Sequence, residues 1–270
     1  MNLLLHTIAL EPARWTPARV SRPLTELLPD IAAAGFRALE VFEPHLGKET
    51  VSPAIRDCFA SLGIAPVILS SYLDLNPART SDALLQKLES ILAERITYYG
   101  FKKVRLFPGS GMNPHDNAAI ARFIERVRSL AYRIYPAQVL LETHDGSLAD
   151  YPALPAGLMS QLPSNVGLLY QPTVFTRESA LDQFEVQKPF IRHLHLQNRN
   201  PDISFATLQS GVIPWPEIIT ALADKVDATI EFVPVGIVPV EAFDLDACLR
   251  QAREEMDYVR TIVDGAVALT

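Results

Sequence analysis

In the second half of the chain, acidic, amide and imidazole side chains recur at or near the ends of short apolar runs. The four residues are Glu142, Gln171, His195 and Glu231. Carboxylate, amide and imidazole groups are ligands that proteins offer to Mn²⁺, Mg²⁺, Co²⁺ or Zn²⁺, and this set alone does not choose among those ions. The residue types therefore predict a divalent metal site, provided that the fold brings them together.

Strand alternation predicts that these groups share an interior. In the run 191–196, His193 and His195 fall on one face of a strand and the leucines fall on the other. The apolar face belongs against helices, so the histidines point inward, and the same pattern turns Glu142 and Glu231 inward. Burying two carboxylates with an imidazole is costly unless they have a partner, and a cation is the simplest one.

The elements that must position these groups form a repeating pattern of helix, glycine, short connection and apolar run. Gly35, Gly63 and Gly100 each stand where a glycine can end a helix before a strand. The predicted strands are 3–8, 38–42, 66–71, 104–107, 139–142, 166–170, 191–196 and 229–232. Eight such units predict an α/β protein with a single (β/α)8 TIM barrel over residues 1–270, whose active site lies at the carboxyl ends of the strands.

Two proline dipeptides predict helix starts. Ser52-Pro53 and Asn113-Pro114 each combine a residue type that caps helices with a proline suited to the first helical position.

Composition limits the classes of partner. The 270 residues include 31 acidic and 24 basic side chains, a net charge of −7, which disfavours nucleic acid and anionic membranes and favours a small molecule. Cys58 and Cys248 are expected to pack in the core, in a reducing compartment. The N-terminal apolar run is too short for a signal peptide or a spanning helix, so we expect a cytoplasmic protein.

Three segments carry a resemblance to a known family: 140–144, 191–198 and 229–231. Together with 34–40 they resemble the xylose isomerase-like TIM-barrel superfamily of sugar isomerases and epimerases, which also includes endonuclease IV, over most of the chain. The resemblance implies a divalent cation held by Glu142, Gln171, His195 and Glu231. It also implies that the two glutamates transfer protons on opposite faces of a sugar.

At strand six the chain departs from the family pattern. The family usually has an aspartate there and a histidine three residues later, whereas this chain has Gln171 and Val174. A glutamine oxygen can coordinate a metal but brings no charge, so we expect weaker cation binding than is usual in the family.

Four more residues are candidates for contact with the substrate. The resemblance puts His193 and Arg199 where some members bind it. Glu40 points inward by alternation and either contacts substrate or makes a structural hydrogen bond. Trp215, between two prolines, either walls the pocket or packs in a loop.

The leading functional hypothesis is a metal-dependent isomerase or epimerase acting on a sugar, a sugar phosphate or a related polyol. Return of the proton to the opposite face gives epimerisation, and return to the neighbouring carbon gives isomerisation; both stay open. The alternative, motivated by Gln171 and Val174, is a barrel that binds a carbohydrate without turnover. DNA cleavage like that of endonuclease IV is disfavoured by the charge and by too few ligands. A homodimer is carried only as an analogy with similar barrels.

Overall fold

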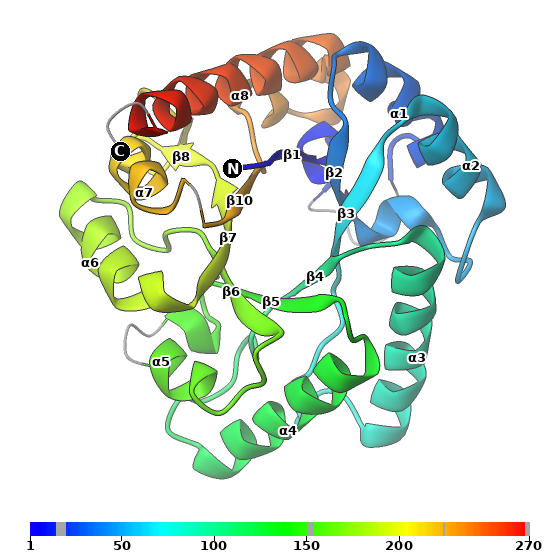
Figure 1. Ribbon diagram of the computed structural model, residues 1–270, viewed down its shortest axis with the longest axis vertical. Helices are drawn as coiled ribbons and strands as arrows, with labels where there is room; N and C mark the ends of the chain where they lie inside the picture. The colour runs from blue at the N-terminus through cyan, green and yellow to red at the C-terminus, as the bar shows by residue number, and fades with distance from the viewer. Residues whose placement is uncertain (15–19, 151–153, 224, 268–270) are drawn as a thin grey trace.

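The computed structural model describes residues 1–14, 20–150, 154–223 and 225–267. Eight parallel strands close into a barrel in the order β1-β10-β7-β6-β5-β4-β3-β2, and helices surround them (Figure 1). Strands β8 (Asn198–Arg199) and β9 (Phe205–Ala206) form a separate antiparallel pair outside the barrel. The predicted (β/α)8 architecture is confirmed.

The barrel strands agree with the predicted runs to within two residues at each end. They are β1 (Leu3–His6), β2 (Ala38–Phe42), β3 (Ala65–Ser70), β4 (Lys103–Leu106), β5 (Gln138–Glu142), β6 (Val166–Tyr170), β7 (Ile191–Leu196) and β10 (Asp227–Ile230). Strand β1 stops early because His6 Nδ1 accepts the Ile8 N–H and the chain turns into a 3-10 helix over Thr7–Leu10. Glu231 follows β10 directly, and its N–H still bonds to the Leu196 carbonyl.

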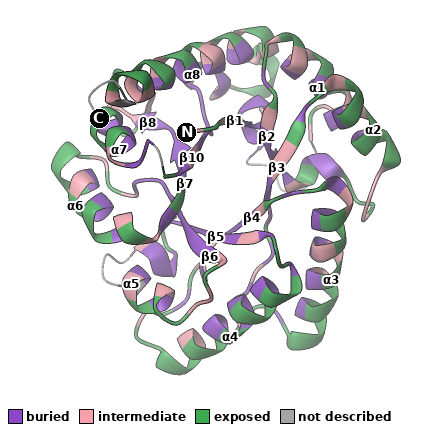
Figure 2. Ribbon diagram, in the orientation of Figure 1, coloured by how far each residue is buried: buried purple, intermediate pink, exposed green. Residues whose placement is uncertain are grey.

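The helices pack one face against the barrel and leave the other in solvent, as the purple and green faces in Figure 2 show. They are α1 (Leu24–Ala33), α2 (Pro53–Leu62), α3 (Asp82–Tyr99), α4 (Asn117–Arg133), α5 (Leu154–Met159), α6 (Arg177–Gln187), α7 (Trp215–Leu222) and α8 (Leu245–Val267). Gly63 and Gly100 end α2 and α3 in the left-handed conformation, with φ of 62° and 79°. This conformation returns the chain to the next strand within a few residues.

One of the two predicted helix starts is wrong. Pro53 opens α2 as expected, although the Ser52 side chain makes no capping hydrogen bond. Helix α4 begins only at Asn117, and its cap is Asp116, which accepts the N–H of Ala119. The Asn113 side chain instead accepts the N–H of His115, a local turn that competes with helix formation.

The barrel interior is layered along its axis. At the amino ends of the strands, Lys103 Nζ lies 3.2 Å from Asp227 Oδ2. Above this pair, toward the carboxyl ends, is an apolar layer formed by Leu4, Ile68, Leu140 and Leu169, all fully buried. The next inward residues along these strands are polar. The candidate site therefore lies directly above this apolar layer.

The two cysteines have the packing roles expected of them. Cys248 is buried on α8, Cys58 is half-buried on α2, and both thiols are free. Among the described residues, no helix is both long and apolar enough to cross a membrane.

Candidate active site at the carboxyl mouth of the barrel

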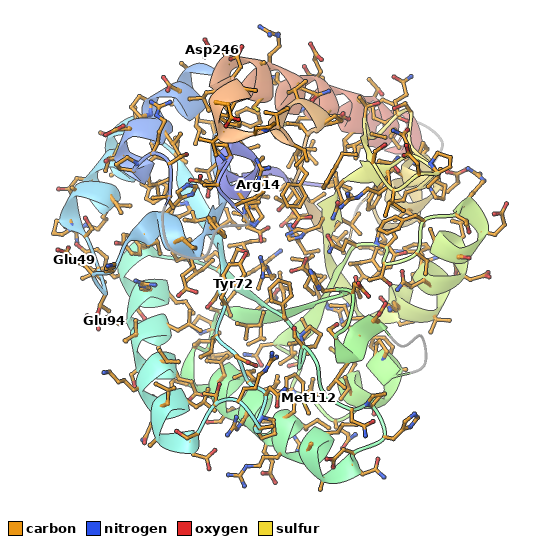
Figure 3. All side chains as sticks on the ribbon, turned by 180° about the vertical axis from the view of Figure 1, so that it is seen from behind. Arg14, Glu49, Tyr72, Glu94, Met112 and Asp246 are labelled. Carbon is orange, nitrogen blue, oxygen red and sulfur yellow. The ribbon has the colours of Figure 1, made fainter. Side chains whose placement is uncertain are left out.

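A cavity of about 410 Å³ opens at the carboxyl ends of the strands. In Figure 3, which shows the molecule from behind, Tyr72 projects over the middle of the barrel, and this residue lines the cavity. Four of the residues expected from the sequence also line it: Glu142, Gln171, Arg199 and Glu231. The cavity therefore lies where barrels of this kind place their active sites.

His195 lies at the centre of the polar groups beneath this cavity and is fully buried. Its Nδ1 is 3.5 Å from Glu142 Oε1 and 3.4 Å from Glu231 Oε1. Its Nε2 is 2.8 Å from Glu40 Oε2. Strands β5, β7 and β2 and the residue after β10 thus bring to one point an imidazole and three carboxylates that are far apart in the sequence.

Glu40 is a support for His195 and does not line the cavity. It is fully buried, and Oε1 lies 3.4 Å from Nε2 of His6. Burial acts to raise the pKa of Glu40, but the adjacent imidazoles, His195 above all, outweigh it and hold that pKa well below its usual range. Of the two expectations for Glu40, the structural hydrogen bond is the one that the geometry shows.

The two histidines that contact Glu40, His6 and His195, differ in protonation state. Burial lowers the pKa of His6 to about 3, so this imidazole is neutral. Burial also acts to lower the pKa of His195, but the Glu40 and Glu231 carboxylates raise it well above 6.5. His195 therefore supplies positive charge among the glutamates when no other cation does.

The donor groups fit a divalent cation. The ligand atoms of Glu142, His195 and Glu231 all lie within 4.8 Å of one another. His195 Nδ1 is buried without a hydrogen-bond partner among the described residues, and Nε2 is held by Glu40 in the way that carboxylates support metal-binding histidines. A second group with this spacing, His6, Glu40 and His195, fits less well because His6 Nδ1 already accepts the Ile8 N–H.

Arg105 is the main site residue that the sequence prediction missed. It comes from β4, lines the cavity, and places Nε 3.0 Å from Glu142 Oε2. Burial acts to raise the pKa of Glu142, but Arg105 is the strongest influence in the other direction and the pKa is lowered overall. The rings of Tyr72 and Phe107 lie 5.2 and 4.4 Å from the guanidinium.

Gln197, just after β7, is a second residue without an assigned role in the prediction. Its Nε2 donates to Gln171 Oε1 at 2.7 Å and to Glu231 Oε2 at 3.0 Å. Its Oε1 accepts from Arg199 Nη2 at 2.9 Å. The amide therefore links three side chains of the cavity and fixes the oxygen that Gln171 would offer to a metal.

His193 and Trp215 do not line the cavity, contrary to the substrate contact expected for His193. Of the two expectations for Trp215, packing is the one that the geometry shows. His193 is one layer below His195, fully buried, with Nε2 2.7 Å from Thr229 Oγ1. Trp215 is also fully buried, and its indole N–H donates to the Gln197 carbonyl. Both residues support the strands that carry the site.

Residues 28–260 match the family described as "Xylose isomerase-like TIM barrel". The chain belongs to this xylose isomerase-like family. No curated protein matches the chain.

Solved structures of the xylose isomerase-like fold cover nearly the whole chain. A probable 3-DHS dehydratase, AsbF from Bacillus anthracis, is 18% identical with a TM-score of 0.70, over 93% of this chain and 98% of that one. An L-ribulose 3-epimerase is 16% identical with a TM-score of 0.70, over 100% and 98%. A Mycobacterium smegmatis protein in complex with magnesium is 15% identical with a TM-score of 0.69, over 98% and 97%. At these identities the likeness concerns the fold alone.

Proposed function

We propose that the protein is a metal-dependent isomerase or epimerase of a sugar, a sugar phosphate or a related polyol. One arrangement carries the proposal: the Glu142 and Glu231 carboxylates lie 3.5 and 3.4 Å from the same nitrogen of His195, at the base of an open cavity. The residues that would hold the cation are Glu142, Gln171, His195 and Glu231. The epimerase and the magnesium-bound protein of the same fold support this choice.

When bound, the cation would supply positive charge near the carbonyl and hydroxyl oxygens of the substrate, and the proton on the carbon that bears this hydroxyl would be easier to remove. Glu142 and Glu231 belong to different sides of the wall, because β6 and β7 separate β5 from β10. One carboxylate removes the proton from carbon. For return to the neighbouring carbon the same group can deliver it, whereas for return to the opposite face the other glutamate must already carry a proton. The carbon and the face that receive it decide between isomerisation and epimerisation.

The test is proton exchange in deuterated buffer. The purified protein is incubated with a panel of aldoses, ketoses and their phosphates, with added Mn²⁺, Co²⁺ or Mg²⁺ or with excess chelator. We expect deuterium at carbon and a new sugar with the metal, loss of both with chelator, and recovery when the ion is returned. Unchanged turnover in excess chelator would refute the metal role.

A second candidate is a barrel that binds a carbohydrate without converting it. The observation in its favour is that Gln171 brings no charge and that its oxygen already accepts a hydrogen bond from Gln197. Binding of a sugar by calorimetry, with no deuterium exchange under any metal condition, would support this candidate against the enzyme.

A further inference from the structure

Two arginines reach the cavity from different parts of the barrel, and both pack against aromatic rings. Arg105 comes from β4, with its guanidinium 4.4 Å from the Phe107 ring centroid. Arg199 comes from β8, with its guanidinium 3.3 Å from the Phe205 ring centroid. An aromatic face attracts a cation without neutralising it, so the rings hold both side chains in place, and Arg105 is in addition paired with Glu142.

Both guanidinium groups keep buried N–H groups without an acceptor. Arg105 Nη1 and Arg199 Nε have no hydrogen-bond partner in the part of the chain that the structure describes. Buried donors are normally satisfied, and the fork of arginine matches the two oxygens of a carboxylate. Both residues line the cavity, where a small turn of either guanidinium would let an anionic ligand oxygen supply the missing acceptors.

The sum of the charges in the site also favours an anionic ligand. Three buried carboxylates belong to it, those of Glu40, Glu142 and Glu231. A divalent cation would bring two positive charges and each guanidinium one more, whereas an imidazole bound to a metal is neutral. With all three carboxylates ionised, the loaded site would therefore hold one positive charge in excess. Asp145 also lines the cavity, but it is exposed at the rim, where water and salt screen it.

The uncharged Gln171 accounts for this excess positive charge, because an acidic side chain at the same position would bring one more negative charge and cancel it. We infer that the substrate is a polyol carrying one carboxylate, received by Arg105 and Arg199, and that the uncharged Gln171 makes the site selective for it. This inference rests on the proposed function for the charge of the metal. A single carboxylate matches the excess, whereas a phosphate monoester carries about two negative charges at neutral pH.

The experiment measures binding and needs no turnover. Protein loaded with Mn²⁺ is titrated calorimetrically with compounds that differ only at carbon six: D-glucose, D-glucuronate and D-glucose 6-phosphate, and the same series for D-galactose. In at least one series we expect the uronate to bind about tenfold or more tighter than the aldose, and tighter than the 6-phosphate.

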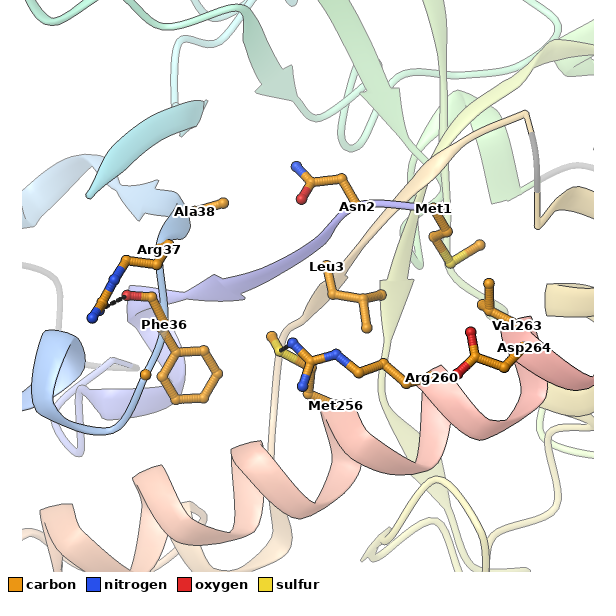
Figure 4. A pocket seen from close by; sticks show the side chains of 11 residues that line it. Met1, Asn2, Leu3, Phe36, Arg37, Ala38, Met256, Arg260, Val263 and Asp264 are labelled. Carbon is orange, nitrogen blue, oxygen red and sulfur yellow. Dashed lines mark hydrogen bonds between the residues drawn. The ribbon is translucent and has the colours of Figure 1, made fainter. Parts of the chain in front are cut away.

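Variants identify the residues responsible. Gln171→Asp should reduce the preference for uronate over aldose by about tenfold to hundredfold, and should tighten Mn²⁺ binding as measured by electron paramagnetic resonance. Arg199→Gln should reduce the preference to a similar degree. The matched control is Arg37→Gln, which removes the same charge beside a cavity of about 320 Å³ at the amino end of the barrel (Figure 4) and should leave the preference unchanged.

Several results would overturn the inference. They are equal binding of uronate and aldose, tighter binding of the 6-phosphate, no binding of either uronate at millimolar concentration, or an unchanged preference in Gln171→Asp. Failure of the proposed reaction gives a different result. In that case the protein prefers uronates but exchanges no deuterium with any substrate.

Discussion

Nε of Arg105 lies 3.0 Å from Oε2 of Glu142, and the two side chains are only 2% and 1% exposed. The pair joins neighbouring strands, β4 and β5, inside the barrel. A buried ion pair of this kind makes each partner depend on the other, because removal of either leaves an unpaired charge away from water. Glu142 is therefore both a candidate catalytic group and half of a structural pair.

Loss of Arg105 should destabilise the fold. We expect Arg105→Gln to lower the free energy of unfolding by about 3 to 5 kcal/mol, because Glu142 would remain buried without its arginine partner. The double variant Arg105→Gln/Glu142→Gln removes both charges and should recover most of this loss in urea titrations. A double variant no more stable than Arg105→Gln would show that the charge of Glu142 is not the cause.

Glu231 can be tested with less disturbance to the fold, since it makes no ion pair with an arginine or lysine among the described residues. Glu231→Gln should keep the thermal midpoint close to that of the parent protein and lower the rate of deuterium exchange at carbon by about 10² to 10⁴-fold. The matched control is Glu241→Gln on the exposed 3-10 helix Val240–Ala242, which should exchange at the parent rate. Normal exchange in Glu231→Gln would remove this residue from the mechanism.

Trp215 should behave as a packing residue. Trp215→Phe keeps most of the buried ring but loses the hydrogen bond to the Gln197 carbonyl, so we expect a loss of about 1 kcal/mol of stability. Manganese and ligand affinities, measured calorimetrically, should stay within about twofold, a change of less than about 0.5 kcal/mol. A selective loss of ligand affinity in a stable Trp215→Phe protein would instead give Trp215 a part in recognition.

Glu255 on α8 should make stability depend on pH. Its carboxylate accepts the N–H of Leu208, and burial raises its pKa to about 7. The pKa of Glu255 is higher in the folded protein than in the unfolded chain. Its contribution to the free energy of unfolding is therefore complete below about pH 4.5 and is lost as the pH rises through 7.

Glu255→Gln removes this titration. At pH 8 the variant should be more stable than the parent by about 1 to 2 kcal/mol, after allowance for solvent screening, and the advantage should disappear near pH 4. Urea titrations at both pH values measure it, with exposed Glu125→Gln on α4 as the control. The interpretation fails if the difference between variant and parent is the same at both pH values.

Strand alternation was enough to predict that Glu142, His195 and Glu231 meet. The sequence shows which face of a strand a residue occupies, and barrel closure then brings those faces together. It does not show depth along the axis, which depends on the stagger between strands. Glu40 is paired in register with His6, and this stagger places it under His195 and away from the cavity.

Arg105 shows the other limit of the prediction. Alternation in β4 already turns Arg105 inward, opposite Val104 and Leu106, so the signal was present. An inward charged residue in a four-residue strand predicts a site only once its partner is known. The partner of Arg105 is Glu142, which lies on the next strand, 37 positions further along the chain. The place of Trp215 likewise depends on a tertiary hydrogen bond that no local pattern contains.

The layer of Leu4, Ile68, Leu140 and Leu169 fills much of the barrel interior between its two ends with apolar side chains. The barrel interior still contains polar groups between its two ends, because His193 and Thr229 are buried one layer below His195, and burial and then Lys103 lower the pKa of His193. A change of charge around His195 is therefore expected to reach the amino end of the barrel through His193.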